Sequence, residues 1–243
     1  MTKLNQFFKE NNVKILKKFK MLCLGLVFIT GSYGAELPYL TTQQLDIIPF
    51  MPAPVVNGSE QDKEQQAQVL AVQRAASVQR IALANKDAEE TVFAMFSSVM
   101  GSNFTAANLP QSTKIFDRIG ETEDAVVDPV KKYFGRIRPF VNNPEIKPLV
   151  KPSTSGSYPS GHTSRSTMMA IILSKMVPEK REAIFIRAHD YAQSRIIGGM
   201  HYPQDLEAGF RAGSAMAATL LASPTFMADF EVSRAEIRKQ LGL

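Results

Sequence analysis

The stretch HTSRSTMMAIIL, residues 162–173, passes from hydroxyl side chains into an apolar run without an internal glycine or proline. We predict a helix over 162–177 that is buried on most sides. A second stretch, AGFRAGSAMAATLLAS at 208–223, is also predicted to be buried on most sides, and its small residues allow another helix to approach closely. Together the two stretches predict a core built from packed helices.

The rest of the chain favours an all-α, single-domain helical bundle. No segment alternates apolar and polar residues for long enough to indicate a sheet, and 243 residues suit one domain. Residues 60–86 lack glycine and proline and predict one long helix that begins after Ser59. Further helices are predicted at about 88–100, 110–133, 179–196, 203–222 and 225–240, for a total of seven to nine.

The first 34 residues have the order of a secretory signal peptide. Lysines come first, then the apolar run MLCLGLVFIT at 21–30, then the small residues GSYGA at 31–35. We predict a signal peptide over 1–34, with an uncleaved anchor as the alternative, and hence a periplasmic or secreted protein. Four prolines in residues 35–59 predict an extended N-terminal arm, which leaves 60–243 as the helical domain.

The net charge of +5 comes from the leader, because the chain after residue 34 holds 22 basic and 22 acidic residues. A neutral body argues against nucleic acid as a partner. Its longest uncharged run, 91–113, is polar and contains Gly101 and Pro110, so we expect no stable membrane insertion after cleavage. The single cysteine, Cys23, lies in the leader, which excludes a disulfide in the mature chain.

A first cluster of charge lies in KKYFGRIRP, residues 131–139. Lys131 and Arg138 are seven residues apart, so both cations share one face if the segment is helical, and Pro139 would end that helix. A solvated basic face is the ordinary alternative.

The second cluster is PSGH, residues 159–162, where a turn leads into the predicted helix. The first N–H groups of a helix are unpaired and attract anions, and Gly161 allows close approach to them. Ser160 suits an N-cap, and His162 follows.

The third cluster is SRIIGGMHYPQD, residues 194–205. Arg195 closes one predicted helix, and Pro203 fits the first turn of the next. His201 and Asp205 are four residues apart, so the carboxylate can hold one ring nitrogen and leave the other as a nucleophile or base. Such a pair alone also occurs in acyltransferases and as a structural hydrogen bond.

Jointly, the three clusters provide three cations, a helix N-terminus and two histidines, of which one has an aspartate partner. Cations and backbone N–H groups hold the oxygens of a phosphoryl group, while one histidine attacks phosphorus and the other protonates the leaving oxygen.

These residues reproduce the K-x6-RP, PSGH and SR-x5-H-x3-D signature, and the chain resembles the type 2 phosphatidic acid phosphatase and vanadium haloperoxidase superfamily. Within it, GSYPSGHT at 156–163 and LDIIPFMPAPVVNGS at 45–59 are similar to class A bacterial non-specific acid phosphatases, which are periplasmic all-α enzymes. The resemblance runs from about Leu45 to the C-terminus.

The resemblance implies a metal-independent acid phosphatase of broad specificity that works through a phosphohistidine. By position, His201 is implied to be the nucleophile, Asp205 orients it, and His162 serves as general acid and then as base. The phosphate-binding residues are implied to be Lys131, Arg138, Ser160, Gly161 and Arg195. No cofactor or metal is expected, inorganic phosphate and vanadate should inhibit, and a homo-oligomer is compatible with the sequence.

The chain departs from the class A pattern in having HYPQD at 201–205 and no tryptophan, which is closer to the lipid-phosphatase branch. A lipid-directed phosphatase at the membrane surface is therefore the first alternative. A vanadate-dependent haloperoxidase and a non-catalytic phosphate-binding protein are the others. The third histidine, His189, lies outside the signature and is interpreted as structural or exposed.

Overall fold

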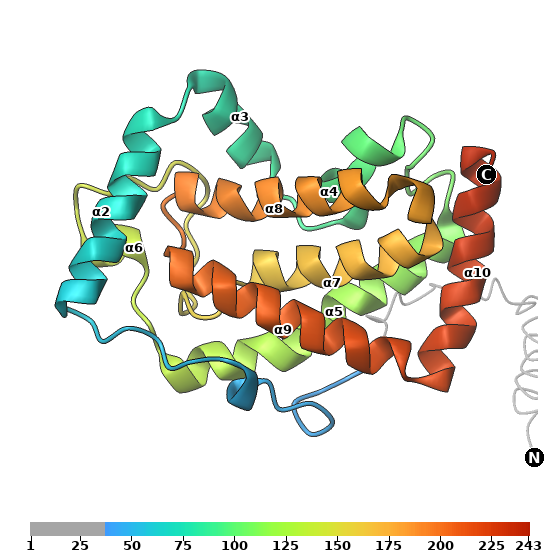
Figure 1. Ribbon diagram of the computed structural model, residues 1–243, viewed down its shortest axis with the longest axis horizontal. Coiled ribbons are helices and arrows are strands. Elements are labelled where there is room, and N and C mark those ends of the chain that lie inside the picture. Colours follow the sequence, from blue (N-terminus) through green and yellow to red (C-terminus); the bar gives the residue numbers. More distant parts are fainter. Residues whose placement is uncertain (1–36) are drawn as a thin grey trace, which may run out of the picture. The chain divides into compact units, whose positions relative to one another are not determined.

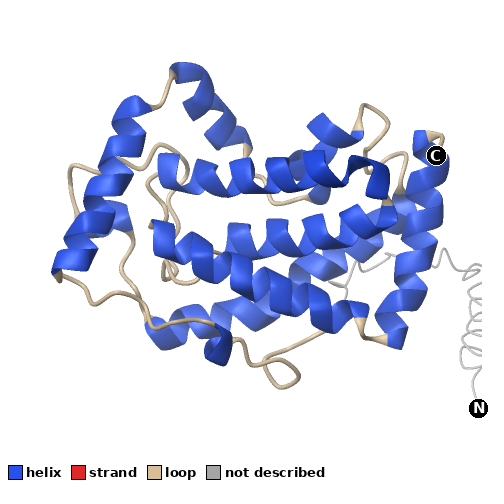
Figure 2. Cartoon of the chain, viewed as in Figure 1, coloured by secondary structure: helices blue, strands red, loops and turns tan. Residues whose placement is uncertain are grey.

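The computed structural model describes residues 37–243, and the predicted signal peptide lies outside this range. The described residues form helices and loops without a strand, which confirms the all-α prediction (Figure 2). The α-helices are α2 (Glu60–Ala75), α3 (Val78–Lys86), α4 (Val92–Met100), α5 (Pro110–Phe134), α6 (Pro139–Asn142), α7 (Gly161–Met176), α8 (Arg181–Ile197), α9 (Pro203–Leu221) and α10 (Pro224–Leu241). Two 3-10 turns, η1 (Ile48–Phe50) and η2 (Pro178–Lys180), complete the order.

The prediction of one long helix over 60–86 is wrong, because the chain turns between α2 and α3. Ala76 adopts an extended conformation with ψ 126°, and the Ser77 hydroxyl accepts a hydrogen bond from Arg80 N at 3.1 Å. A serine that caps a new helix can therefore interrupt a strongly helical composition without glycine or proline.

Helix α7 lies between α8 and α9 and also contacts α4, α5 and α10 (Figure 1). Thirteen of its 16 residues are buried, as predicted. Helix α9 is also buried or half-buried on most sides, as predicted, with nine of its 19 residues buried. Its exposed stripe, spaced by three or four residues, is formed by Glu207, Arg211, Ser214 and Ala218.

Two glycines bring α9 against α7, as the small residues predict. A Cβ at Gly209 would lie 2.7 Å from the Thr163 Cβ and 2.8 Å from Ser160 O. A Cβ at Gly213 would lie 2.8 Å from the Thr167 Cβ and closer still to Ser164 O. The backbone approach at the start of α7 therefore fixes the two segments that carry the histidine motifs.

Gly213→Ala is expected to lower the free energy of unfolding by ~1–3 kcal/mol, because the added methyl must push α9 away from the α7 backbone. The measurement is the urea midpoint, with Ser214→Ala as the control on the exposed side of α9. Equal midpoints for the two variants would contradict the close approach.

Residues 37–59 carry η1 and no α-helix, and Leu40, Ile47 and Met51 join the main apolar core. Val55 N donates to Gln204 Oε1 at 2.9 Å, so this segment reaches the first turn of α9. No helix within residues 37–243 has both the length and the apolar character needed to cross a membrane.

Candidate active site

His201 is buried in the short loop between α8 and α9, with 2% of its surface exposed. Its Nδ1 lies 2.8 Å from Ser157 O, and its Nε2 lies 3.2 Å from Arg138 Nη1. A carbonyl oxygen only accepts and a guanidinium only donates. The ring proton is therefore on Nδ1, and Nε2 presents a lone pair to the cation.

Asp205 lies in the first turn of α9, 3.4 Å from His201 Nδ1 through its Oδ2. The same oxygen accepts the N–H of Tyr202 at 2.8 Å, and Oδ1 accepts Arg136 Nη1 at 2.5 Å. Burial raises the pKa of Asp205 to about 6, although Arg136 acts against this. The histidine and aspartate are brought together, but a main-chain oxygen is the closer partner of the ring.

Arg136 is the first site residue that the sequence interpretation missed. It is buried, its guanidinium lies 4.1 Å above the Tyr202 ring, and it pairs with Asp205. It is one of four basic residues in KKYFGRIRP, and its spacing does not distinguish it from the others as a site residue.

Lys131 and Arg138 do not share a helix face, because α5 ends before Arg138. Gly135 adopts the left-handed conformation with φ 57°, its N–H bonds Lys131 O at 2.9 Å, and Pro139 begins α6 rather than ending α5. Arg138 is instead held by carbonyl oxygens, with Nε 2.8 Å from Ser155 O and Nη1 3.0 Å from Met200 O.

Lys131 faces the N-terminus of α7, where a Cβ on Gly161 would lie 3.0 Å from its Nζ. Ser160 is the N-cap, and its hydroxyl accepts Thr163 N at 3.3 Å, so the oxygen is engaged in capping. Ser160 N donates to Asp205 O at 3.0 Å, which ties the start of α7 to α9. The N–H of Gly161 belongs to the first turn of α7, where no intrahelical partner is available.

Arg195 lies in the last turn of α8 and is 4% exposed. Its Nε and Nη1 are buried without a hydrogen-bond partner in the described part of the chain, and burial lowers its pKa. Buried donors of this kind are costly unless an acceptor binds them. The side chain is therefore suited to an anion.

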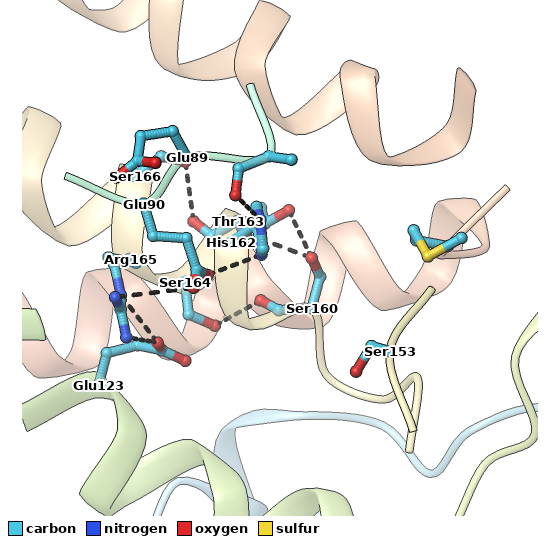
Figure 3. A network of polar contacts seen from close by, with 12 residues as sticks. Glu89, Glu90, Glu123, Ser153, Ser160, His162, Thr163, Ser164, Arg165 and Ser166 are labelled. Carbon is cyan, nitrogen blue, oxygen red and sulfur yellow. Dashed lines mark hydrogen bonds and ion pairs between the residues drawn. The ribbon is translucent and has the colours of Figure 1, made fainter. Parts of the chain in front are cut away.

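His162 follows Gly161 at the start of α7, and its ring stacks on Tyr191 with 5.9 Å between centroids. Its Nδ1 lies 2.7 Å from Glu90 Oε1, and its Nε2 lies 3.4 Å from Ala88 O. Figure 3 shows Glu90 between His162 and Arg165. Glu90 is the second residue that the sequence interpretation missed.

The protonation states of His162 and Glu90 depend on each other. Burial and the Arg195 guanidinium lower the pKa of His162 to about 4, while Glu90 acts in the opposite direction. Burial alone would raise the pKa of Glu90, but the hydrogen bond with His162 lowers it to about 2.

The predicted cations gather around His201. Burial, and then Arg138, Arg195, Lys131 and His162, lower the pKa of His201 well below its usual value. A pocket of about 770 Å³ beside this group is lined by Lys131 and Arg138, whereas His201 and Arg195 are not part of its lining. Within residues 37–243, no three His, Cys, Asp or Glu side chains are placed to hold a metal ion. His189 is exposed and stacks on Phe210, away from this group.

Residues 122–227 match the model of the PAP2 superfamily. A non-specific acid phosphatase from Providencia stuartii is 31% identical over 243 residues, which cover 92% of this chain and 98% of the relative. The chain belongs to the non-specific acid phosphatases of the PAP2 superfamily. This enzyme is also 32% identical to a non-specific acid phosphatase from Salmonella typhi, over 63% of its own length and 61% of the relative.

An acid phosphatase from Zymomonas mobilis is 32% identical to the enzyme over 66% of its length and 63% of the relative. Among solved structures, a transmembrane PAP2-type phosphatidylglycerolphosphate phosphatase from Bacillus subtilis matches with a TM-score of 0.47 and 17% identity, covering 67% of this chain and 85% of that chain. All eight site residues predicted from the sequence lie inside the matched range 122–227 of this acid phosphatase, whereas Glu90 lies before it.

Proposed function

We propose that this acid phosphatase hydrolyses a broad range of phosphate monoesters through a phosphohistidine at His201, without a metal ion. The observation that carries the proposal is the lone pair of His201 Nε2, which lies 3.2 Å from Arg138 Nη1. A neutral imidazole beside a guanidinium can attack phosphorus while the cation holds a phosphoryl oxygen.

In the first half of the reaction, Nε2 of His201 forms a bond to phosphorus as the ester P–O bond breaks. The bonding electrons leave with the ester oxygen, which takes a proton from Nε2 of His162. In the second half, His162 accepts a proton from water as the water oxygen attacks phosphorus, and the P–N bond breaks. Lys131, Arg138 and Arg195, with the N–H groups at the start of α7, hold the phosphoryl oxygens in both halves.

The proposal extends to the predicted signal peptide over 1–34, to a periplasmic or secreted location, and to the arm and helical domain as units of the mature chain. It also includes competitive inhibition by inorganic phosphate and by vanadate, which can adopt the geometry of the phosphoryl transition state.

Turnover is expected to be highest at acid pH. His162 must carry its proton, and its pKa is lowered to about 4, so kcat/KM should fall as the pH rises through that value and through the second ionisation of the substrate. His201 stays neutral over the same range because its pKa lies well below the usual value. A bound phosphoryl dianion favours the charged imidazole, so the alkaline limb of kcat should lie at higher pH than that of kcat/KM.

The experiment is a panel of p-nitrophenyl phosphate, a nucleoside monophosphate and phosphatidic acid, each measured across pH. Comparable kcat/KM values on the two soluble esters support broad specificity. A clear preference for the lipid would replace it with a lipid-directed phosphatase, and activity that rises steadily into alkaline pH would contradict the acid role of His162.

A further inference from the structure

The partner of His162 comes from outside the segments that carry the signature. Glu90 lies in the linker between α3 and α4, and its Oε1 accepts the Nδ1–H of His162 at 2.7 Å. With Nδ1 engaged in this way, Nε2 is the nitrogen left for another partner, and it lies 3.4 Å from Ala88 O in the same linker. Both ring nitrogens of His162 are thus met by a segment that precedes the matched range 122–227.

We propose that Glu90 is a positioning residue that fixes the orientation and the proton of His162 for its work as general acid. The inference rests on the proposed function of His162. When the imidazolium gives its Nε2 proton to the leaving oxygen, the remaining proton is on Nδ1, where Glu90 accepts it. The carboxylate therefore stabilises both the charged acid and the neutral tautomer that the transfer leaves behind.

Glu90 belongs to a network of charged side chains centred on the largely buried Arg165. Its Oε2 lies 3.9 Å from Arg165 Nη1, and Arg165 Nη2 pairs with Glu123 Oε2 at 2.9 Å (Figure 3). The same Nη2 pairs with Asp124 Oδ1 at 2.8 Å. Burial raises the pKa of Glu123 to about 7, although Arg165 and Lys131 act against this.

The charged groups around His162 differ in whether they favour or oppose a proton on its ring. The surrounding elements contribute Glu90 from the α3–α4 linker, Glu123 and Lys131 from α5, Arg165 from α7, Tyr191 and Arg195 from α8, and His201 from the α8–α9 loop. Arg195 and Arg165 both oppose protonation of the ring. Among the described residues, Glu90 is the only carboxylate that contacts the ring, so the loss of its charge removes the contact that favours the protonated imidazole.

Glu90→Gln tests the inference, because glutamine keeps the size and one acceptor oxygen but removes the charge. The matched control is Glu89→Gln, since the neighbouring carboxylate is exposed and makes no ion pair among the described residues. The first measurement is an NMR titration of the imidazole of His162 in the full chain, which contains three histidines. In Glu90→Gln the pKa of His162 is expected to fall by about 1–3 units, whereas Glu89→Gln leaves it unchanged.

The second measurement is leaving-group dependence. An alkyl phosphate such as glycerol phosphate needs a proton on its leaving oxygen, whereas p-nitrophenolate departs without one. Glu90→Gln is expected to lower kcat/KM, which reports the first half of the reaction, about 10–100-fold on the alkyl phosphate and less than about 3-fold on p-nitrophenyl phosphate. Glu90→Asp, which keeps the charge, should give a smaller loss and guards against a folding defect in the glutamine variant.

His162→Ala is measured in parallel so that two failures can be told apart. If His162→Ala loses activity selectively on the alkyl phosphate while Glu90→Gln matches the wild type, Glu90 has no positioning role and the assignment of His162 as general acid is kept. If Glu90→Gln lowers kcat/KM equally on both substrates and leaves the pKa of His162 unchanged, the role of Glu90 is structural. If His162→Ala shows no leaving-group selectivity, the general-acid assignment fails and the inference about Glu90 fails with it.

Discussion

His201→Ala is expected to lower kcat by about 10⁴-fold or more, because the variant has no atom that can form the bond to phosphorus. The wild-type ring is held with its lone pair on Nε2 by Ser157 O on one side and Arg138 on the other. The measurement is turnover of p-nitrophenyl phosphate, combined with rapid acid-free quenching of ³²P-labelled substrate. The wild type should accumulate a protein-bound phosphoryl group that is stable in base and labile in acid, and the variant should accumulate none.

His189→Ala is the control, since its ring is exposed and stacks on Phe210. It should keep both turnover and the labelled intermediate. A His201→Ala enzyme with wild-type turnover, or a labelled intermediate that persists in it, would show that another group attacks phosphorus.

Arg195→Met is expected to have opposite effects on catalysis and on stability. Turnover should fall about 10²–10³-fold, as is typical when one donor that faces developing negative charge is removed. The free energy of unfolding should stay the same or rise, because Nε and Nη1 of Arg195 are buried without a partner in the described residues and methionine fills a similar volume. The measurements are kcat/KM and a urea denaturation curve without phosphate.

Arg187→Met provides the contrast on the same helix. The side chain of Arg187 is 10% exposed and pairs with Asp87 and Asp190, so its loss leaves Asp87 as an unpaired buried charge. We expect Arg187→Met to lower stability by ~3–5 kcal/mol. If Arg195→Met destabilises the fold as much as Arg187→Met does, the guanidinium of Arg195 has a structural role and its assignment to the phosphoryl group is wrong.

Much of the fold could be predicted because helix formation is governed by local composition. Prolines and caps marked the starts of α5, α9 and α10 within about two residues, and the small residues of α9 predicted the close approach of another helix, which in the structure is α7. Two predictions about where a helix ends were wrong, and in both cases a single residue overrides the helical composition around it. Ser77 caps a new helix where the sequence favours continuation, and Gly135 ends α5 before Arg138.

The predicted site residues could be named because they lie in three short motifs. The residues that surround them could not, because their partners are set by packing between distant segments. Glu90 lies far from His162 in the sequence, in a linker with no motif of its own. Arg136 is one of four cations in its segment, so the sequence does not single it out. The closest partner of His201 Nδ1 is a main-chain oxygen, and every residue has one, so no residue type predicts it.

That main-chain oxygen bears on how the enzyme can be altered by directed evolution. Any amino acid at position 157 supplies a carbonyl, but Ser157 is fully buried and its N–H donates to Arg136 O at 2.9 Å, so only small residues other than proline are expected to keep the loop on its path. An insertion or deletion between residues 151 and 160 moves the carbonyl itself and changes which ring nitrogen is bare. In variant libraries of this phosphatase, the length of the loop and a small residue at position 157 are the two features to hold constant.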